Sequence, residues 1–362
     1  MTADLPTTMR AMVTMGHGGL EQMVLHPAWP RPEPAAGEVL IKVGACGLNN
    51  TDVNTRSGWY SKAVSEATTG DAFEAVNTDD PTWGGNPIVF PRIQGADVCG
   101  EIVAVGESVD AGRIGERVIT DNWLRDPEDP LNRDKTGYFG SECHGGYAEY
   151  TVIPAANALA VASDYSDAEL ATFSCSYSTA EGMVCRAAIT ASDTVLITGA
   201  SGGVGGALIQ LVKLRGARVI ALSSTEKHEA VSALGADRVL PRSPENLGAE
   251  LADERVTVVA DVVGGPDWHS VIDVLERGGR YVSSGAIAGP IVELDLRTFY
   301  LRDLTLLGST VIPPDVTENL IRYIESQAIK PVLAATYPLE QLRDAQAAFI
   351  AKTHTGNIVV AP

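Results

Sequence analysis

At 362 residues the chain is long enough for two domains, and 45% hydrophobic with 20% charged residues is an ordinary globular composition. The formal net charge of −19 argues against nucleic acid as a partner, because a phosphate backbone is attracted to basic surfaces. The chain shows no secretory signal at its start and no apolar run of about 18 residues, so we expect a cytoplasmic protein that does not enter a membrane.

The first part of the chain is predicted to form short β-strands separated by turns. Residues 37–43 place Glu38 and Lys42 among apolar neighbours, which is the alternation of a half-buried strand. Apolar runs at 102–106 and 117–120 predict two more strands. Short strands with glycines between them are typical of a compact, barrel-like domain.

The segment 59–92 has the period of neither a helix nor a strand, and its aromatic residues include Trp59 and Trp83. Loops of this length in compact proteins are usually functional lids or disordered. We expect a lid that excludes water or selects a flat apolar substrate. A cover for a subunit edge is the alternative.

Strands and helices alternate from residue 191 onward. Residues 194–198 form a continuous apolar run, as in a parallel sheet that is covered on both faces. Further strands, with helices between them, are predicted at 218–222, 256–263, 280–284 and 304–307. This alternation predicts a doubly wound α/β domain. After it, we expect a helix at 316–326 and a strand at 357–360 that rejoins the first domain.

A glycine-rich loop follows the 194–198 strand and leads into an apolar-faced helix. This strand–turn–helix context is what a dinucleotide phosphate site requires, because glycines let the backbone approach a pyrophosphate and the helix N-terminus offers free N–H groups. A glycine-rich turn without a ligand is the alternative. The residues expected to contact the cofactor are Gly199, Ser201, Gly202, Gly203 and Val204, while Gly205 lets helix and strand pack closely.

The end of the second strand indicates which cofactor is used. A domain that prefers NAD usually places Asp or Glu there to bind the ribose 2′-hydroxyl. This chain has Ser223 and Ser224, whose hydroxyls can donate to a 2′-phosphate, followed by Lys227, which can balance its charge. We therefore predict NADPH. Glu226 is the residue that could hold a ribose instead.

These features resemble the medium-chain dehydrogenase/reductase superfamily, and within it the quinone oxidoreductases. Besides the glycine loop, the resemblance is carried by residues 47–52 (Gly-Leu-Asn-Asn-Thr-Asp), 95–100 (Gly-Ala-Asp-Val-Cys-Gly), 145–150 and 235–237. It covers nearly the whole chain and implies an α/β protein with a GroES-like, β-rich catalytic domain at 1–160 and 313–362. It implies a Rossmann domain at 161–312, with hydride transfer in a cleft between the two. A homodimer or homotetramer is implied as well.

The resemblance also bears on metal binding. Zinc alcohol dehydrogenases of this superfamily hold a catalytic metal with Cys, His and Cys, and the matching positions here are Asn49, Ala96 and Cys175. Alanine cannot bind a metal, and the scattered cysteines contain no CxxC pair for a structural zinc. We therefore predict no metal, although Asp52 and Asp97 leave a makeshift oxygen-rich site open.

By the same resemblance, Asn49 and Tyr60 are expected to donate hydrogen bonds to the substrate. Asn49 has an alternative role as a turn-capping amide, and Tyr60 as a packing residue under the long loop. Thr51 matches a hydroxyl proton relay, but Asn54 replaces the relay histidine, so the relay is incomplete. Further cofactor contacts are expected from Thr179, Ser284 and Asn357.

The expected reaction follows from the missing metal. Oxidation of an unactivated alcohol is hard without a Lewis acid, whereas a conjugated, electron-poor carbon accepts hydride if donors stabilise the resulting oxyanion. We predict NADPH-dependent reduction of a small molecule, either a quinone or an α,β-unsaturated carbonyl, with an enoyl thioester as a close variant. The alternatives are a zinc-dependent alcohol dehydrogenase and an NADPH-binding protein without turnover.

Overall fold

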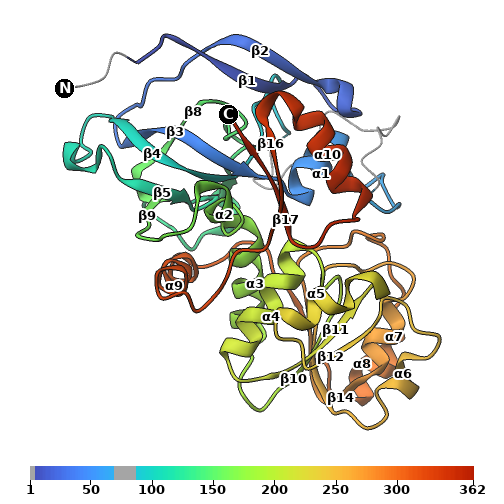
Figure 1. Cartoon of the computed structure of the whole chain (residues 1–362). Coiled ribbons are helices and arrows are strands. Elements are labelled where there is room, and N and C mark those ends of the chain that lie inside the picture. The colour runs from blue at the N-terminus through green and yellow to red at the C-terminus, as the bar shows by residue number, and fades with distance from the viewer. Residues whose placement is uncertain (1–4, 69–86) are drawn as a thin grey trace. The chain divides into compact units, whose positions relative to one another are not determined.

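The computed structural model of the chain describes residues 5–68 and 87–362 (Figure 1). Two compact units make up the chain: the first is Met1–Val64, Thr69–Cys175 and Pro313–Pro362, and the second is Ser65–Thr68 and Ser176–Ile312. Within the described ranges, every helix is too short or too polar to span a lipid bilayer.

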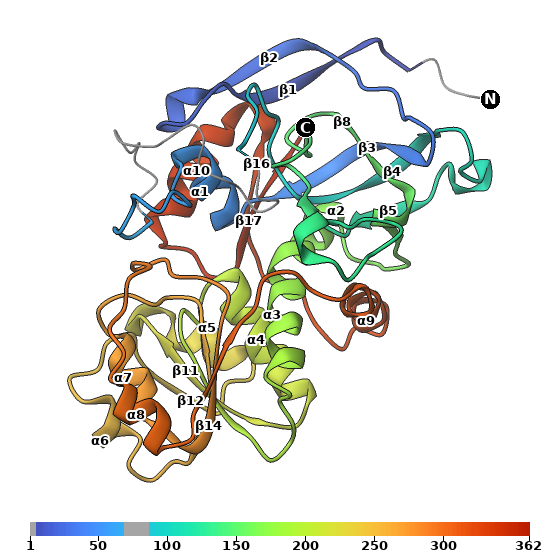
Figure 2. The same ribbon diagram turned by 180° about the vertical axis from the view of Figure 1, so that it is seen from behind.

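The first unit is rich in β-structure. Its elements are β1 (Thr8–Thr14), β2 (Met23–Pro30), β3 (Glu38–Gly47), α1 (Asn50–Ser57), β4 (Asp97–Val105), β5 (Arg117–Thr120), β6 (Trp123–Leu124), β7 (Gly137–Tyr138), β8 (Tyr150–Pro154), β9 (Ala158–Ala160), α2 (Asp167–Leu170), α9 (Pro314–Glu325), β16 (Leu333–Pro338), α10 (Leu342–Ala351) and β17 (Asn357–Ala361). The main sheet has the strand order β16-β17-β3-β4-β5-β9, and β8 also pairs with β3. Strands β1 and β2 form a separate antiparallel pair, at the top of Figure 2.

Strand β3 is an interior strand of the main sheet. Lys42 is exposed between the buried Ile41 and Val43, but residues 39–41 are buried in succession, so the expected alternation holds only around Lys42. Strand β17 pairs antiparallel with β3, with Val360 opposite Cys46. The C-terminal strand therefore lies in the main sheet of the first unit, beside β3.

The second unit is a doubly wound α/β domain, as predicted. Its elements are α3 (Ser174–Arg186, shared at its start with the first unit), β10 (Thr194–Ile197), α4 (Gly203–Leu214), β11 (Arg218–Ser223), α5 (His228–Ala233), β12 (Arg238–Pro241), α6 (Leu247–Glu250), β13 (Val256–Asp261), α7 (Trp268–Asp273), β14 (Leu275–Ser283), α8 (Leu296–Leu301) and β15 (Thr305–Gly308). The sheet is parallel, in the order β12-β11-β10-β13-β14-β15. Helices α3 and α4 lie on one side of it and α6, α7 and α8 on the other (Figures 1 and 2).

Cover on both faces explains the apolar strands of this sheet. Val195, Leu196 and Ile197 of β10 are fully buried, and so are Leu208 and Leu211 on the inner face of α4. A side chain of this kind contributes about 1.5–3 kcal/mol when it leaves water. The continuous apolar run therefore fixes β10 as a central strand.

Residues 161–175 lie between the predicted and the observed domain boundary. The sequence analysis places the boundary at residue 160, whereas the structure keeps these residues with the first unit. Arg117 of β5 accounts for the difference, because its guanidinium donates to Asp167 Oδ1 at 2.8 Å and to the carbonyl of Tyr165 at 2.6 Å.

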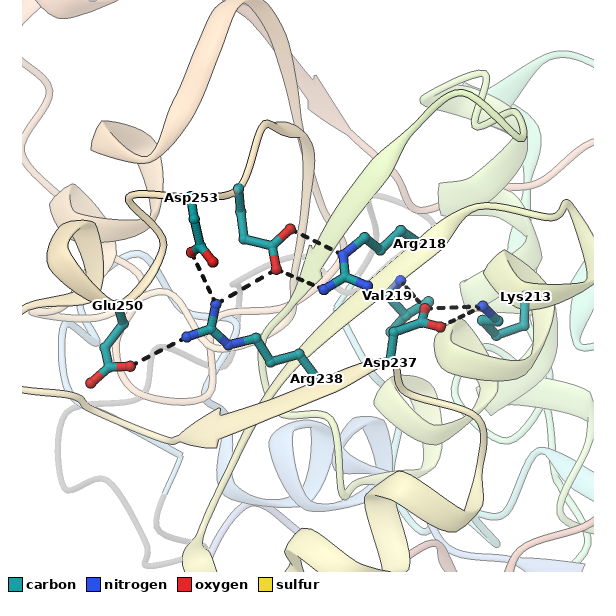
Figure 3. Close-up of polar contacts among 8 residues, drawn as sticks. Lys213, Arg218, Val219, Asp237, Arg238, Glu250 and Asp253 are labelled. Atoms are coloured by element: carbon teal, nitrogen blue, oxygen red, sulfur yellow. Dashed lines mark hydrogen bonds and ion pairs between the residues drawn. The ribbon is translucent and has the colours of Figure 1, made fainter.

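The amino ends of β11 and β12 carry a network of ion pairs (Figure 3). Glu254 binds the Arg218 guanidinium at 2.7 Å, and Arg238 lies within 3.6 Å of the same carboxylate. Beside it, Asp237 accepts from the N–H of Val219 at 2.7 Å and from Lys213. These contacts tie neighbouring strands together at the end of the sheet opposite the glycine-rich loop.

Part of the long segment at 59–92 is described. Trp59 and Tyr60 follow α1 and their rings meet edge to face, with centroids 5.7 Å apart. The middle of the predicted lid, including Trp83, lies outside the described residues.

Candidate active site

The glycine-rich loop sits at the carboxyl end of the central strand β10. Gly199 has a left-handed φ of 58°, and Gly202 caps helix α4. A Cβ on Gly205 would lie 2.2 Å from the carbonyl oxygen of Gly199, so only glycine lets the helix approach the turn this closely. A Cβ on Gly202 would meet only that oxygen, at 3.5 Å. The outer side of the turn is therefore open.

This turn fits a pyrophosphate. The first hydrogen bond to the backbone of α4 runs from Gly206 N–H to the Gly202 carbonyl, so the N–H groups of Gly203, Val204 and Gly205 precede it and can receive an anion. Ser201, Gly202, Gly203 and Val204 are all partly exposed. The structure thus brings the predicted phosphate-binding residues together on one turn.

The predicted ribose-phosphate residues lie at the end of the neighbouring strand β11. Ser223 is buried, and the Ser224 hydroxyl hydrogen-bonds the carboxylate of Glu226, whose pKa is lowered mainly by a bond to its own backbone. Lys227 is half-buried, and burial together with the nearby charge of Arg242 lowers its pKa. Glu226 is exposed to solvent.

Sequence reasoning missed Arg242. This residue directly follows β12, just as Ser223 closes β11, and parallel strands bring their carboxyl ends to one edge. The same rule that selects Ser223 could have found Arg242. Two cations, Arg242 and Lys227, therefore stand beside the serines.

Of the remaining cofactor candidates, two belong to the second unit. Ser284 follows β14, and its hydroxyl donates to the sulfur of Met183 at 3.0 Å. Thr179 is half-buried and lies one helical turn before Met183 on α3, so the two share a helix face. Asn357 belongs to the first unit, where it is buried at the start of β17 and donates its N–H to the Val332 carbonyl at 2.8 Å.

The predicted catalytic residues gather at helix α1 of the first unit. Asn49 is the N-cap of this helix and Thr51 lies in its first turn. The hydroxyl of Tyr60 hydrogen-bonds the side chains of Thr51 and Asn54, and burial raises its pKa well above the ordinary value. Thr51, Asn54 and Tyr60 therefore form one connected polar group.

Asn49 also belongs to what we call the Asn49–Asp97 cluster: Asn49, Asp97, Asn122 and the backbone N–H of Cys175. Asn49 Nδ2 donates to Asp97 Oδ2 at 3.0 Å, and Asn122 Nδ2 donates to Asp97 Oδ1 at 2.8 Å. The Cys175 N–H donates to the same Oδ1 at 2.9 Å. Asp97 is only 1% exposed. The carboxylate thereby fixes the orientation of the Asn49 carboxamide.

Two carboxyl groups are buried in this region. Burial raises the pKa of Asp97 to about 7, against the opposing effect of its amide donors. Burial likewise raises the pKa of Asp52 to about 6, although it accepts from Tyr147 and from the Asn49 N–H, each at 2.9 Å. Both carboxyls therefore hold a proton to a higher pH than exposed aspartates do.

Asn49, Ala96 and Cys175, the positions matched above to the zinc ligands of alcohol dehydrogenases, come together in the fold but do not form a zinc donor set. Ala96 has no donor atom, and the Asn49 amide nitrogen faces Asp97. The oxygens of Asp52 and Asp97 are occupied by N–H and O–H donors. Within residues 5–68 and 87–362, no group of three or more His, Cys, Asp or Glu could hold a metal. Zinc needs three protein ligands and an open position, which this arrangement does not offer.

Comparison with known proteins identifies the family. An alcohol dehydrogenase GroES-like domain model matches residues 35–163, and a zinc-binding dehydrogenase model matches residues 203–326. An NADPH-dependent alkenal/one oxidoreductase of Arabidopsis thaliana is 30% identical over 99% of this chain and 81% of its own. Acryloyl-coenzyme A reductase of Metallosphaera sedula is 29% identical over 92% and 94%, and human quinone oxidoreductase 26% over 93% and 92%.

A solved structure agrees with these relatives. A protein from Sinorhizobium meliloti 1021, assigned as an alcohol dehydrogenase, is 46% identical with a TM-score of 0.90, over 99% of this chain and 98% of its own. The resemblance inferred from the glycine loop and the short segments is thereby confirmed. The chain belongs to the medium-chain dehydrogenase/reductase superfamily, as an oxidoreductase that uses a nicotinamide cofactor.

Proposed function

We propose that this protein is an NADPH-dependent reductase of α,β-unsaturated carbonyl compounds or quinones that works without a catalytic zinc. One observation carries the proposal: at the position that matches a zinc ligand of the zinc alcohol dehydrogenases, this chain has a carboxamide, Asn49, oriented by the buried carboxyl of Asp97. A hydrogen-bond donor stands in the place of a Lewis acid. Such a donor suits a reaction whose oxyanion is delocalised.

A bound nicotinamide would supply the hydride. The chain's own task is then to hold the substrate oxygen, which gains negative charge when hydride reaches the β-carbon of an enone or a ring carbon of a quinone. Asn49 Nδ2 carries two hydrogens and, among the described residues, donates one to Asp97, so the second would bind that oxygen. Asp97 acts through Asn49 and keeps it in place.

Tyr60 is the second donor in this proposal. Because its pKa is raised by burial, the hydroxyl stays protonated at neutral pH and acts as a donor rather than as a base. Its contacts with Thr51 and Asn54 orient it. No histidine occupies the Asn54 position, so the proton relay of zinc alcohol dehydrogenases does not continue beyond Thr51.

The choice of NADPH rests on the β11 end. Ser223 replaces the carboxylate that would repel a 2′-phosphate, and Lys227 and Arg242 bring two positive charges near it. The exposed Glu226 is already bound to Ser224 and its charge lies among these cations. An added phosphate would relieve the repulsion between Lys227 and Arg242.

The names of relatives support the same class of substrate. They act on acryloyl-coenzyme A, on alkenals and alkenones, or on quinones, all of which are conjugated and electron-poor. A zinc-dependent alcohol dehydrogenase is the second candidate, because several solved relatives are described as alcohol dehydrogenases. Metal content separates the two.

The test is NADPH oxidation by the purified full chain against quinones, enones, enals and enoyl thioesters, with zinc measured on the same sample. We expect turnover with at least one conjugated acceptor, a lower KM for NADPH than for NADH, and less zinc than protein. Stoichiometric zinc with activity only toward simple alcohols would overturn the proposal. A Ser223→Asp variant should shift the preference toward NADH by about tenfold or more, since one like charge costs about 1.4 kcal/mol or more at this range.

A further inference from the structure

The strand order of the second unit reverses direction between the neighbouring strands β10 and β13. From β10 the chain moves to β11 on one side, and from β13 it moves to β14 on the other, so neighbouring strands β10 and β13 lead away from each other. Ligands of open α/β sheets bind at such a switch point, outside the carboxyl ends of the strands. The residues that close β10 and β13 therefore border the place where a dinucleotide crosses the sheet.

Asp261 is the last residue of β13, and its side chain contacts Thr198 at the end of β10. The register places Ile197 opposite Ala260, and Thr198 donates its N–H to the Ala260 carbonyl at 3.1 Å. Beyond that pair, the Thr198 hydroxyl donates to Asp261 Oδ1 and accepts from the Val262 N–H at 3.2 Å. The Thr198 hydroxyl and the Asp261 carboxylate thus link the ends of β10 and β13 by hydrogen bonds.

The other contacts of Asp261 hold the loop that follows β13. Its Oδ1 accepts from the N–H of Val263 at 2.8 Å, and Gly264 donates to both oxygens at 3.2 Å. Tyr281 of β14 donates its hydroxyl to Oδ2 at 2.6 Å. Asp261 is 1% exposed, so these donors replace its water entirely.

The two loops joined by Asp261 also pack against each other. Gly199 after β10 and Gly264 after β13 both have a φ of 58°, which is the left-handed conformation. A Cβ on Gly199 would lie 3.0 Å from Val262 Cγ2 and 3.2 Å from Val263 Cγ2. A small change in the β13 loop would therefore displace the turn that leads into α4.

Asp261 differs in this respect from the buried carboxylate at the opposite end of β10. Asp193 precedes that strand, is 5% exposed, and forms an ion pair with Arg280 besides accepting from Thr257 at 2.7 Å. Across residues 5–68 and 87–362, Asp261 is in no ion pair, and its donors are hydroxyls and backbone N–H groups. Asp193 neutralises the charge of Arg280, whereas Asp261 holds the backbone of the 262–265 loop in place.

We propose that Asp261 is a positioning residue for the nicotinamide cofactor: it fixes the spacing between the Gly199 turn and the 262–265 loop. It does not touch the cofactor itself. The proposal rests on nicotinamide binding, and it depends neither on the preference for NADPH nor on the substrate class.

The test compares Asp261→Asn with Asp193→Asn in the full chain. Asp261→Asn replaces one of the two oxygens that accept from the Gly264 N–H with a nitrogen that cannot accept, so the 262–265 loop loses a hydrogen bond whichever way the amide lies. We expect the Kd of NADPH and of NADH, measured by isothermal titration, to rise about tenfold together. The KM for the cofactor should rise equally, while kcat at saturating cofactor changes less than about twofold. Asp193→Asn should lower the melting temperature and leave both Kd values unchanged.

Two substitutions of Thr198 give a second test of cofactor affinity, which does not require the Asp261→Asn variant to fold. Thr198→Val removes the hydrogen bond to Asp261 and should weaken the binding of both NADPH and NADH. Thr198→Ser keeps the hydroxyl and should bind both with wild-type affinity. The proposal is overturned if Thr198→Val and Thr198→Ser bind alike, or if Asp261→Asn loses stability with unchanged Kd. A preference for NADH would refute the proposed function and leave this comparison intact, because the expected loss is the same for both nucleotides.

Discussion

The proposed cofactor edge of the second unit, which comprises residues 199–205, 223–227 and 242, and the Asn49–Asp97 cluster of the first unit are both polar, but they are built from different parts of the chain. The proposed cofactor edge lies where parallel strands end, and its glycine turn offers backbone N–H groups. The cluster depends on side chains from α1, β4 and the residues after β5. Backbone geometry carries the first site, and side-chain identity carries the second.

This difference predicts how each site fails. A backbone site should be sensitive to the volume of a residue that has no functional group, whereas a side-chain site should be sensitive to a single amide or carboxyl and tolerant of changes nearby. Substitutions in each unit test this difference.

The largest effect is expected at Gly205. In Gly205→Ala the added Cβ would lie 2.2 Å from the Gly199 carbonyl oxygen and 2.6 Å from Ala200 Cα, so α4 must move away from the turn. Overpacking of this kind should lower the free energy of unfolding by about 3 kcal/mol and weaken cofactor binding. Gly206→Ala is the control, because its Cβ would meet only the flexible end of Leu234, at 3.2 Å, and alanine favours a helix by about 1 kcal/mol. Denaturant titration of both variants decides the point, and equal destabilisation would contradict it.

Asn49 should show the next largest effect. Asn49→Ala removes the proposed donor to the substrate oxygen, and loss of one such donor lowers kcat about 100-fold, or about 2.7 kcal/mol. Asn122→Ala deletes the other carboxamide on Asp97 but no proposed substrate contact, so its kcat should fall only a few-fold. Steady-state kinetics at saturating NADPH distinguish the two. A similar loss in both variants would mean that Asn49 matters only as a partner of Asp97.

These two sites also differ in how far the sequence could predict them. The strand at 194–198, the glycine loop and Ser223 are contiguous features with a fixed spatial meaning, and the structure places them together. The sequence predicts no role for Asp97 in orienting Asn49, because its partners Asn122 and Cys175 lie 25 and 78 residues further along the chain. Nothing local indicates that such residues meet. Asp261 and Arg242 lie between these cases, since strand-end position alone could have selected them.

Asp97 provides a pH test of the same contrast. An unfolded aspartate ionises near pH 3.9, whereas the folded Asp97 keeps its proton up to about pH 7. Between these values the folded state binds one more proton than the unfolded state, so stability is greatest at the acidic side and falls as pH rises. We expect the advantage of wild type over Asp97→Asn to shrink by about 2 kcal/mol from pH 5 to pH 7.

Chemical denaturation of both proteins across this range measures that difference. Asp52 contributes a fall of the same sign, but it is present in both proteins and cancels to first order. A difference that stays constant with pH would show that Asp97 is ionised throughout. The ionised carboxylate of Asp97 would then orient Asn49, and any pH dependence of the stability would have to come from Asp52.

The smallest effect is expected at the amino ends of β11 and β12, in the network of Figure 3. Arg238 forms contacts of 3.4 to 3.6 Å with Asp253, Glu250 and Glu254, and its side chain is 28% exposed. Long, partly solvated ion pairs contribute less than about 1 kcal/mol, so Arg238→Ala should barely change the melting temperature, and less still in high salt. The cofactor Kd should not change at all, because the opposite end of the sheet carries the glycine turn. A raised Kd in this variant would show that strand pairing transmits strain along β11 to Ser223, and the cofactor edge could then no longer be treated as a site set by its own loops.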